Sequence, residues 1–99
     1  NASKDDAIAI GTGAIASGKQ SISVGTGNVV SGDNSGAFGD PSTITGTGSY
    51  SVGNNNTIST NNTFVMGSNV TTTQANSVVL GNASTDRAAT LKQRPQSAP

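Results

Sequence analysis

The sequence predicts an all-β fold, a parallel β-roll (solenoid) of about six coils, and two observations carry this prediction. A five-residue unit returns every fourteen residues without an insertion, over six copies. Within the unit, the second and fourth positions are apolar in nearly every copy and the others are small or β-branched, which is a strand pattern closed by a glycine turn. A fixed period of this kind indicates a repeat architecture. The closing glycines are Gly11, Gly25, Gly39, Gly53, Gly67 and Gly81.

A second, more polar strand is expected in each period. Fourteen residues leave room for two short strands with a tight turn after each. One position of this second strand is apolar in most copies: Ala16, Val30, Ile44, Ile58 and then Thr72. Stacking of the coils places each residue beside its equivalent in the next coil, about 4.8 Å away. We expect the second strand to face water.

The first strand has the composition of a strand that is buried on both faces, because small uncharged residues lie between its apolar positions. One face can cover the interior of the roll, but a single chain offers nothing to cover the other. We therefore expect copies of the chain to associate through this strand. The residues expected to supply the buried contacts of the roll and of its assembly are Ile8, Ile10, Ile22, Val24, Val52, Met66, Val78 and Leu80.

Two features single out the middle coils. In the third coil, Gly36 replaces the apolar second residue, and the dipeptide 40–41 (Asp-Pro) predicts a locally altered turn, since proline forms turns and cannot donate to a strand ladder. In the next two coils, Tyr50 and Phe64 occupy the same register. We expect their rings to stack as neighbours.

Composition excludes several classes of function. The formal net charge is zero and charged residues are only 10%, so nothing directs the chain to nucleic acid or acidic lipid. The sequence has no histidine and no cysteine, which removes the usual base of a serine nucleophile and the usual nitrogen and sulfur metal ligands. We expect no catalytic residue, cofactor or metal site, and no enzyme; an acyltransferase of the β-helix type is excluded by the period and by the missing histidine.

The units at residues 21–25 and 49–53, and also 7–11, resemble the head repeats of YadA-like trimeric autotransporter adhesins. Residues 77–87 resemble the last head coil of that family running into the neck. The resemblance covers about residues 7–90, and it implies a left-handed β-roll, a homotrimer and neck contacts for Asp86 and Arg87. Departures at Gly36, at 40–41 and at the non-glycine positions 60 and 74 concern local turn shape.

The resemblance also sets the expected organisation. We expect a polar lead-in at 1–6, head repeats at 7–81, the start of the neck at 82–90 and flanking sequence at 91–99. Because the sequence begins partway into a repeat, we expect a fragment without its stalk and its C-terminal membrane anchor. The resemblance implies display on the outer membrane of a Gram-negative bacterium, and adhesion to host extracellular-matrix or receptor proteins or to other cells.

The exposed adhesive surface is expected on the second strand and its turns, at Asn28, Asn56, Thr57, Asn69, Thr71 and Thr73. Two alternatives stay open. One is a purely structural spacer of a surface fibre. The other is an ice-binding solenoid, which needs a regular column of threonines on a flat face. The register 43, 57, 71 is threonine, but the column after the first glycines loses threonine at Asp40.

Overall fold

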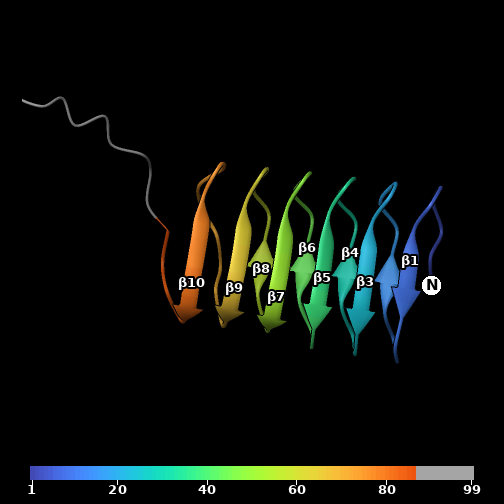
Figure 1. Cartoon of the computed structure of the whole chain (residues 1–99), viewed down its shortest axis with the longest axis horizontal. Coiled ribbons are helices and arrows are strands. Elements are labelled where there is room, and N and C mark those ends of the chain that lie inside the picture. The colour runs from blue at the N-terminus through green and yellow to red at the C-terminus, as the bar shows by residue number, and fades with distance from the viewer. Residues whose placement is uncertain (87–99) are drawn as a thin grey trace, which may run out of the picture.

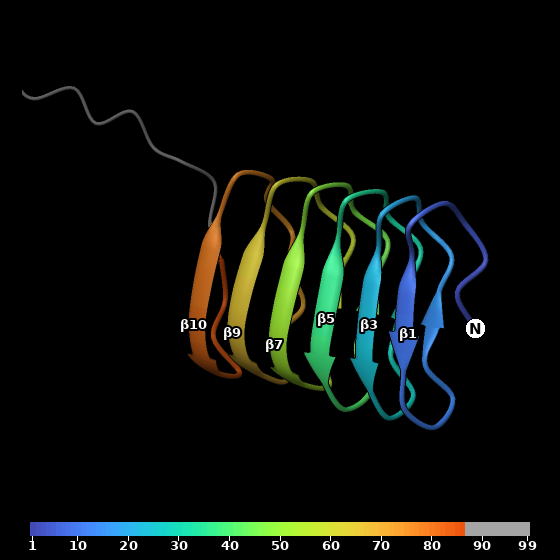
Figure 2. The same ribbon diagram turned by 45° about the vertical axis from the view of Figure 1, so that its right-hand side comes forward.

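The computed structural model describes residues 1–86 and confirms the predicted all-β, parallel solenoid. Ten strands form two parallel sheets, which Figures 1 and 2 show as two stacks of arrows running in opposite directions. The six-stranded sheet holds β1 (Ile8–Ile10), β3 (Ile22–Gly25), β5 (Gly36–Gly39), β7 (Tyr50–Asn54), β9 (Phe64–Ser68) and β10 (Val78–Asn82). The four-stranded sheet holds β2 (Ile15–Ala16), β4 (Val29–Val30), β6 (Thr43–Ile44) and β8 (Thr57–Ile58).

Every pairing joins residues that are fourteen positions apart, as Ile8 with Ile22 and Tyr50 with Phe64. The six strands of the large sheet are therefore linked by five steps, which make about five full turns. In Figure 1 the large sheet lies in front with its strands running downward, the small sheet runs upward behind it, and the coils advance from right to left. This winding is left-handed, as the family resemblance implies.

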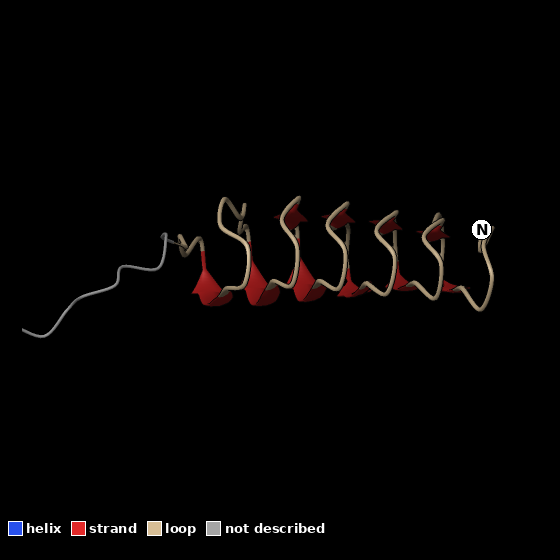
Figure 3. Cartoon of the chain, turned by 90° about the horizontal axis from the view of Figure 1, so that it is seen from above, coloured by secondary structure: helices blue, strands red, loops and turns tan. Residues whose placement is uncertain are grey.

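The interior of the roll is narrow, and Figure 3 shows the two sheets as closely spaced layers. In its apolar cluster, residues at the third position of the five-residue units contact inward residues from the opposite side of the coil. The second-strand register predicted from the sequence is buried throughout, with Ile44 and Ile58 fully inaccessible. The interior cluster consists of Val30, Ala37, Ile44, Ile58, Val65, Val70 and Val79.

The prediction that the apolar positions of the first strand fill the roll is wrong. Alternate side chains of a strand point to opposite faces, so the second and fourth residues share one face and the third faces the other. The small third residue points inward, and the apolar pair points outward. Ile22 and Val24 are half-buried, whereas the other six predicted core residues are exposed: Ile8, Ile10, Val52, Met66, Val78 and Leu80. Their predicted contact with another copy of the chain stays a prediction.

Buried hydroxyl groups explain why most of the units begin with serine or threonine, the first unit beginning with Ala7 instead. The Oγ of Ser35 donates to the carbonyl oxygen of Gly46 (2.7 Å) and accepts from the backbone N–H of Ser49 (3.0 Å). Ser49 repeats the arrangement by accepting from the backbone N–H of Thr63 (3.1 Å). This ladder satisfies the backbone groups of successive turns inside the roll, as burial requires.

The closing glycines are required by the close approach of neighbouring coils. Gly25 has a φ of 131°, and a Cβ atom there would lie 1.8 Å from the carbonyl oxygen of Gly39. A second left-handed position follows in the same turn, with positive φ at Gly13, Gly27, Asn55, Asn69 and Ala83. Proline cannot adopt positive φ, and Pro41, in the same register, does not share this conformation. The altered turn predicted for the third coil is thereby confirmed.

Residues 1–6, which the sequence predicts as a polar lead-in, are hydrogen-bonded to the first coil of the roll. Ala2 pairs in parallel with Ala16, and the N–H of Ala16 donates to the carbonyl oxygen of Asn1 (2.8 Å). The N–H of Gln20 donates to the carbonyl oxygen of Asp5 (2.9 Å). Residues 1–6 thus form the second half of a preceding coil. At the other end, β10 extends to Asn82, one residue past the expected end of the repeats.

Candidate interaction surfaces

The outer side of the large sheet is a continuous apolar surface, which we call the apolar face. It consists of the apolar residues at the second and fourth positions of the five-residue repeat units, and the fourteen-residue register sets them in two parallel columns. Exposure is highest toward the last coils, at 60% for Met66, 64% for Leu80 and 69% for Val78. The face consists of Ile8, Ile10, Ile22, Val24, Phe38, Tyr50, Val52, Phe64, Met66, Val78 and Leu80.

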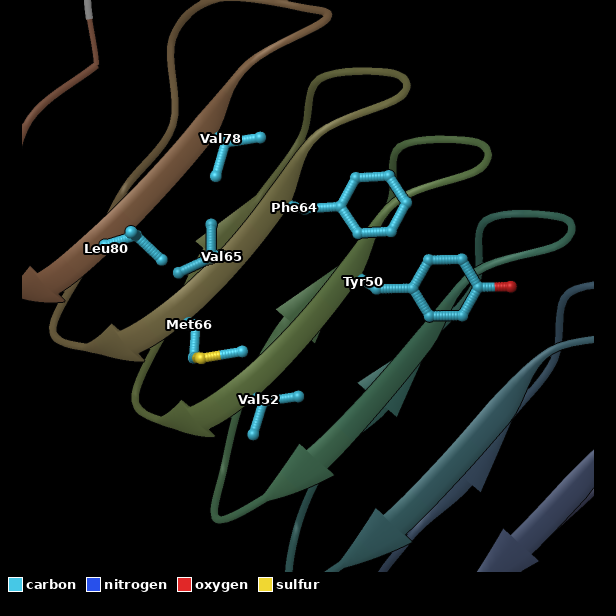
Figure 4. A pocket seen from close by; sticks show the side chains of 7 residues that line it. All are labelled: Tyr50, Val52, Phe64, Val65, Met66, Val78 and Leu80. Atoms are coloured by element: carbon cyan, nitrogen blue, oxygen red, sulfur yellow. The ribbon is translucent and has the colours of Figure 1, made fainter.

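The last three coils of this face form a shallow apolar hollow (Figure 4). The rings of Tyr50 and Phe64 stack with centroids 5.3 Å apart and planes 19° from parallel, which confirms the predicted neighbours. Gly36 completes the arrangement, because a Cβ atom there would lie 2.9 Å from Cδ2 of Tyr50. The Tyr50 ring thus occupies the space that a side chain at position 36 would need. The hollow is lined by Tyr50, Val52, Phe64, Val65, Met66, Val78 and Leu80.

Two of the predicted adhesive residues are wrong, because Asn28 and Asn56 are 0% and 1% exposed. Their amide groups bond to backbone groups of the neighbouring coil. The Nδ2 of Asn28 donates to the carbonyl oxygens of Val24 (2.9 Å) and Gly39 (2.8 Å), and its Oδ1 accepts from the N–H of Ser42 (2.8 Å). A buried amide must be bonded in this way, so these two side chains fasten coils together and are unavailable to a ligand.

The other four predicted adhesive residues, Thr57, Asn69, Thr71 and Thr73, are exposed. Asn69 belongs to a row of amides at the turns: the Nδ2 of Asn55 donates to its Oδ1 (2.8 Å), and its own Nδ2 donates to Oδ1 of Asn82 (2.9 Å). Thr57 and Thr71 form a parallel β-bridge between neighbouring coils, on the small-sheet side of the roll. The predicted adhesive residues therefore do not form one surface, because Asn69 lies at a turn and Thr57 and Thr71 lie on the small-sheet side.

The YadA head domain repeat matches the chain twice, at residues 2–28 and at residues 16–42. The two copies begin fourteen residues apart (16 − 2 = 14), which is the pairing offset of every coil. Residues 2–42 therefore carry YadA-like head repeats. None of the curated proteins matches the chain. Beyond residue 42, the same register continues through β10, so the β-roll extends to Asn82.

A YadA-like head is an adhesin-type domain. Within residues 1–86, no three histidine, cysteine, aspartate or glutamate side chains gather in a way that would hold a metal ion. Over the same range, the head contains no helix with the length and apolar character needed to cross a membrane. The large features of the described surface are thus its two outer sheet faces and its turns.

Asp86 fastens the end of the head. Its carboxylate accepts from the backbone N–H groups of Thr73 and Gln74 and from the Thr73 hydroxyl, each at 2.8 Å. Partial burial acts to raise the pKa of Asp86, but the hydrogen bonds from Gln74 and Thr73 outweigh it and lower the pKa below its ordinary value. The predicted neck contact of Asp86 with another chain stays a prediction, and Arg87 lies outside the described residues.

Proposed function

We propose that this head assembles into a homotrimer through its apolar face and serves as the adhesive tip of a fibre on the bacterial outer membrane. The observation that supports it is the apolar face itself. Monomeric proteins rarely expose contiguous apolar patches of this kind, and such patches mark interaction sites. Between Pro41 and Thr85 the sequence has no charged residue, so no charge on the last coils of the face opposes a second copy.

The energetics favour covering this face. Burying the exposed half of a large aliphatic or aromatic side chain stabilises an assembly by about 1 kcal/mol. Six such side chains of the face are at least 45% exposed in its last four coils, counting Phe38. Their combined burial offsets the entropy lost on association. These six are Phe38, Val52, Phe64, Met66, Val78 and Leu80.

Adhesion would follow from repetition. Three identical chains present each weak contact three times, and a surface carries many fibres, so avidity raises binding without a deep pocket. We propose a protein of the host extracellular matrix, a host receptor or another cell surface as the target. A head that only spaces another domain along the fibre is the alternative, and it would assemble in the same way.

Solution mass tests the assembly. Light scattering coupled to size exclusion is expected to give three times 9.7 kDa for the chain. Val52→Asp puts a charge on the apolar face at a residue that does not fill the roll, so it is expected to give a folded monomer. Thr45→Asp, at an exposed position just after β6 on the opposite side of the roll, is the matched control and should stay trimeric. A monomeric parent chain would overturn the proposal.

Adhesion is tested separately, by binding of the trimer and of the Val52→Asp chain to immobilised matrix proteins, receptor proteins and whole cells. The trimer is expected to bind at least ten-fold more strongly than the monomeric variant, because avidity is lost with assembly. A trimer that binds none of these targets would reject the adhesive role and favour the spacer.

A further inference from the structure

The small-sheet side of the roll carries a second ordered surface, which we call the hydroxyl face: Thr43, Thr45, Thr57, Ser59, Thr71 and Thr73. Thr43, Thr57 and Thr71 are paired in register from coil to coil. Thr45, Ser59 and Thr73 lie two residues further on and point to the same side, since side chains alternate. The three coils that hold these residues therefore contribute two hydroxyl groups each to this side of the molecule, away from the apolar face, whereas Ile15 and Val29 occupy the same register in the two preceding coils.

These hydroxyl groups differ from those elsewhere in the roll. All six residues are exposed. Within residues 1–86, the inward hydroxyls of Thr60, Thr63 and Thr72 are bonded to one another or to backbone. On the hydroxyl face, the Thr73 hydroxyl donates to the Asp86 carboxylate at 2.8 Å. The hydroxyls of the other five residues make no side-chain hydrogen bond within the part of the chain that the structure describes, so among these residues they are available to a partner.

The face is regular and stiff. Neighbouring coils are about 4.8 Å apart and alternate residues of one strand about 6.6 Å apart, so the hydroxyls form a two-dimensional lattice. Threonine is β-branched and has restricted side-chain rotation. Underneath, Ile44 and Ile58 are fully buried and hold the strands in place. Each threonine adds a methyl group beside its hydroxyl, so the lattice alternates apolar and hydrogen-bonding groups.

The chemistry of this face restricts its partner. Its six residues include no aromatic ring on which a sugar could stack and are themselves uncharged, while the Asp86 carboxylate lies at one end of the face, bonded to Thr73. A partner that gains from such a surface must itself be a neutral, repeating lattice of hydrogen-bonding groups. Ordered water at the surface of ice has this chemistry.

We propose that the hydroxyl face binds ice. The row of threonines was visible in the sequence at 43, 57 and 71, but the column that argued against ice binding, with Asp40, belongs to a turn and not to this face. The column at 45, 59 and 73 completes the lattice. Because the face lies opposite the apolar face, ice binding is compatible with trimer formation and does not depend on it.

Inhibition of ice recrystallisation by the parent chain tests the proposal, together with its partition into a growing ice surface. Thr57→Lys places a long charged side chain at the centre of the face and is expected to weaken inhibition at least ten-fold. Thr47→Lys, an exposed threonine at a turn outside the face, is the matched control and should retain the parent activity. Thr57→Val removes only the hydroxyl and should give an intermediate loss.

Solution mass and circular dichroism of each variant distinguish a loss of ice binding from unfolding, since all three are expected to keep the parent's fold and mass. A parent chain that neither inhibits recrystallisation nor enters ice would overturn the proposal, whatever its oligomeric state. Equal loss in Thr47→Lys and Thr57→Lys would also overturn it, because the effect would then come from charge alone and not from this face.

Discussion

The Nδ2 of Asn56 lies 2.9 Å from the carbonyl oxygen of Gly67, one coil along, in a side chain that is 1% exposed. The same amide nitrogen donates to the Oγ of Ser51 (2.9 Å), and the amide oxygen accepts from the N–H of Val70 (3.0 Å). One side chain therefore links a large-sheet strand of its own coil to both ends of the next turn. Asn28 repeats this role two coils earlier.

Replacing Asn56 with leucine should destabilise the roll more than a surface change would. The variant leaves the carbonyl of Gly67 and the N–H of Val70 without their partner, and a buried unsatisfied group costs about 1–3 kcal/mol. Urea unfolding followed by circular dichroism measures the loss. Asn56→Ser is the matched control, because serine occupies the same register at Ser42 and bonds there to the next coil. If Asn56→Leu unfolds at the parent's urea concentration, the amide does not stabilise the roll.

The period, the two strands of each coil and the Tyr50–Phe64 stack were predictable, because each depends only on register. Which side of the first strand faces the interior of the roll was not predictable. A hydrophobic pattern identifies which residues avoid water but not whether the chain itself or another copy covers them. In this thin roll only the small third residues fit inside, as Ala37 and Ser51 do. The burial of Asn28 was missed for a related reason, since one asparagine in a polar stretch gives no sign of its partners.

Two glycines of one turn differ in what holds them: at Gly25 close backbone approach adds to an unfavourable φ of 131°, whereas Gly27 has a left-handed conformation that asparagine also adopts. Gly25→Ala is expected to destabilise the roll severely, by more than about 3 kcal/mol, because its Cβ would lie 1.8 Å from the carbonyl oxygen of Gly39 and the backbone must move. Gly27→Asn, two residues on, should be nearly neutral. Gly27 has a φ of 73°, and asparagine adopts this conformation in the same register at Asn55 and Asn69. Thermal unfolding of both variants checks the contrast; equal effects would show that close approach does not set the glycine column.

Gly36 is expected to control the shape of the apolar face without controlling the fold. A side chain at this position displaces the Tyr50 ring, whose Cδ2 and Cε2 atoms would lie 2.9 and 3.0 Å from the new Cβ. Gly36→Val should therefore leave the far-ultraviolet circular dichroism intact, alter the tyrosine signal in the near ultraviolet and lower the trimer's stability toward dilution. Adding Tyr50→Ala should restore assembly in part, since the ring is no longer in the way. A Gly36→Val chain with the parent's tyrosine signal and dilution behaviour would contradict the packing seen here.

The stability of the last turn of the roll is expected to depend on pH through the carboxyl group of Asp86. The pKa of its carboxyl is lowered in the folded chain by hydrogen bonds from Gln74 and Thr73, so the charged form stabilises the fold. This contribution is fully present above the ordinary pKa of 3.8 and is lost as pH falls through the lower, folded value. Hydrogen exchange at the Thr73 and Gln74 amides should therefore quicken in acid relative to the amides of the inner coils, after correction for the intrinsic exchange rate. In Asp86→Asn the two amides should exchange faster at neutral pH and lose this extra acid sensitivity. Unchanged exchange in that variant at neutral pH would mean that the carboxylate does not hold the last turn.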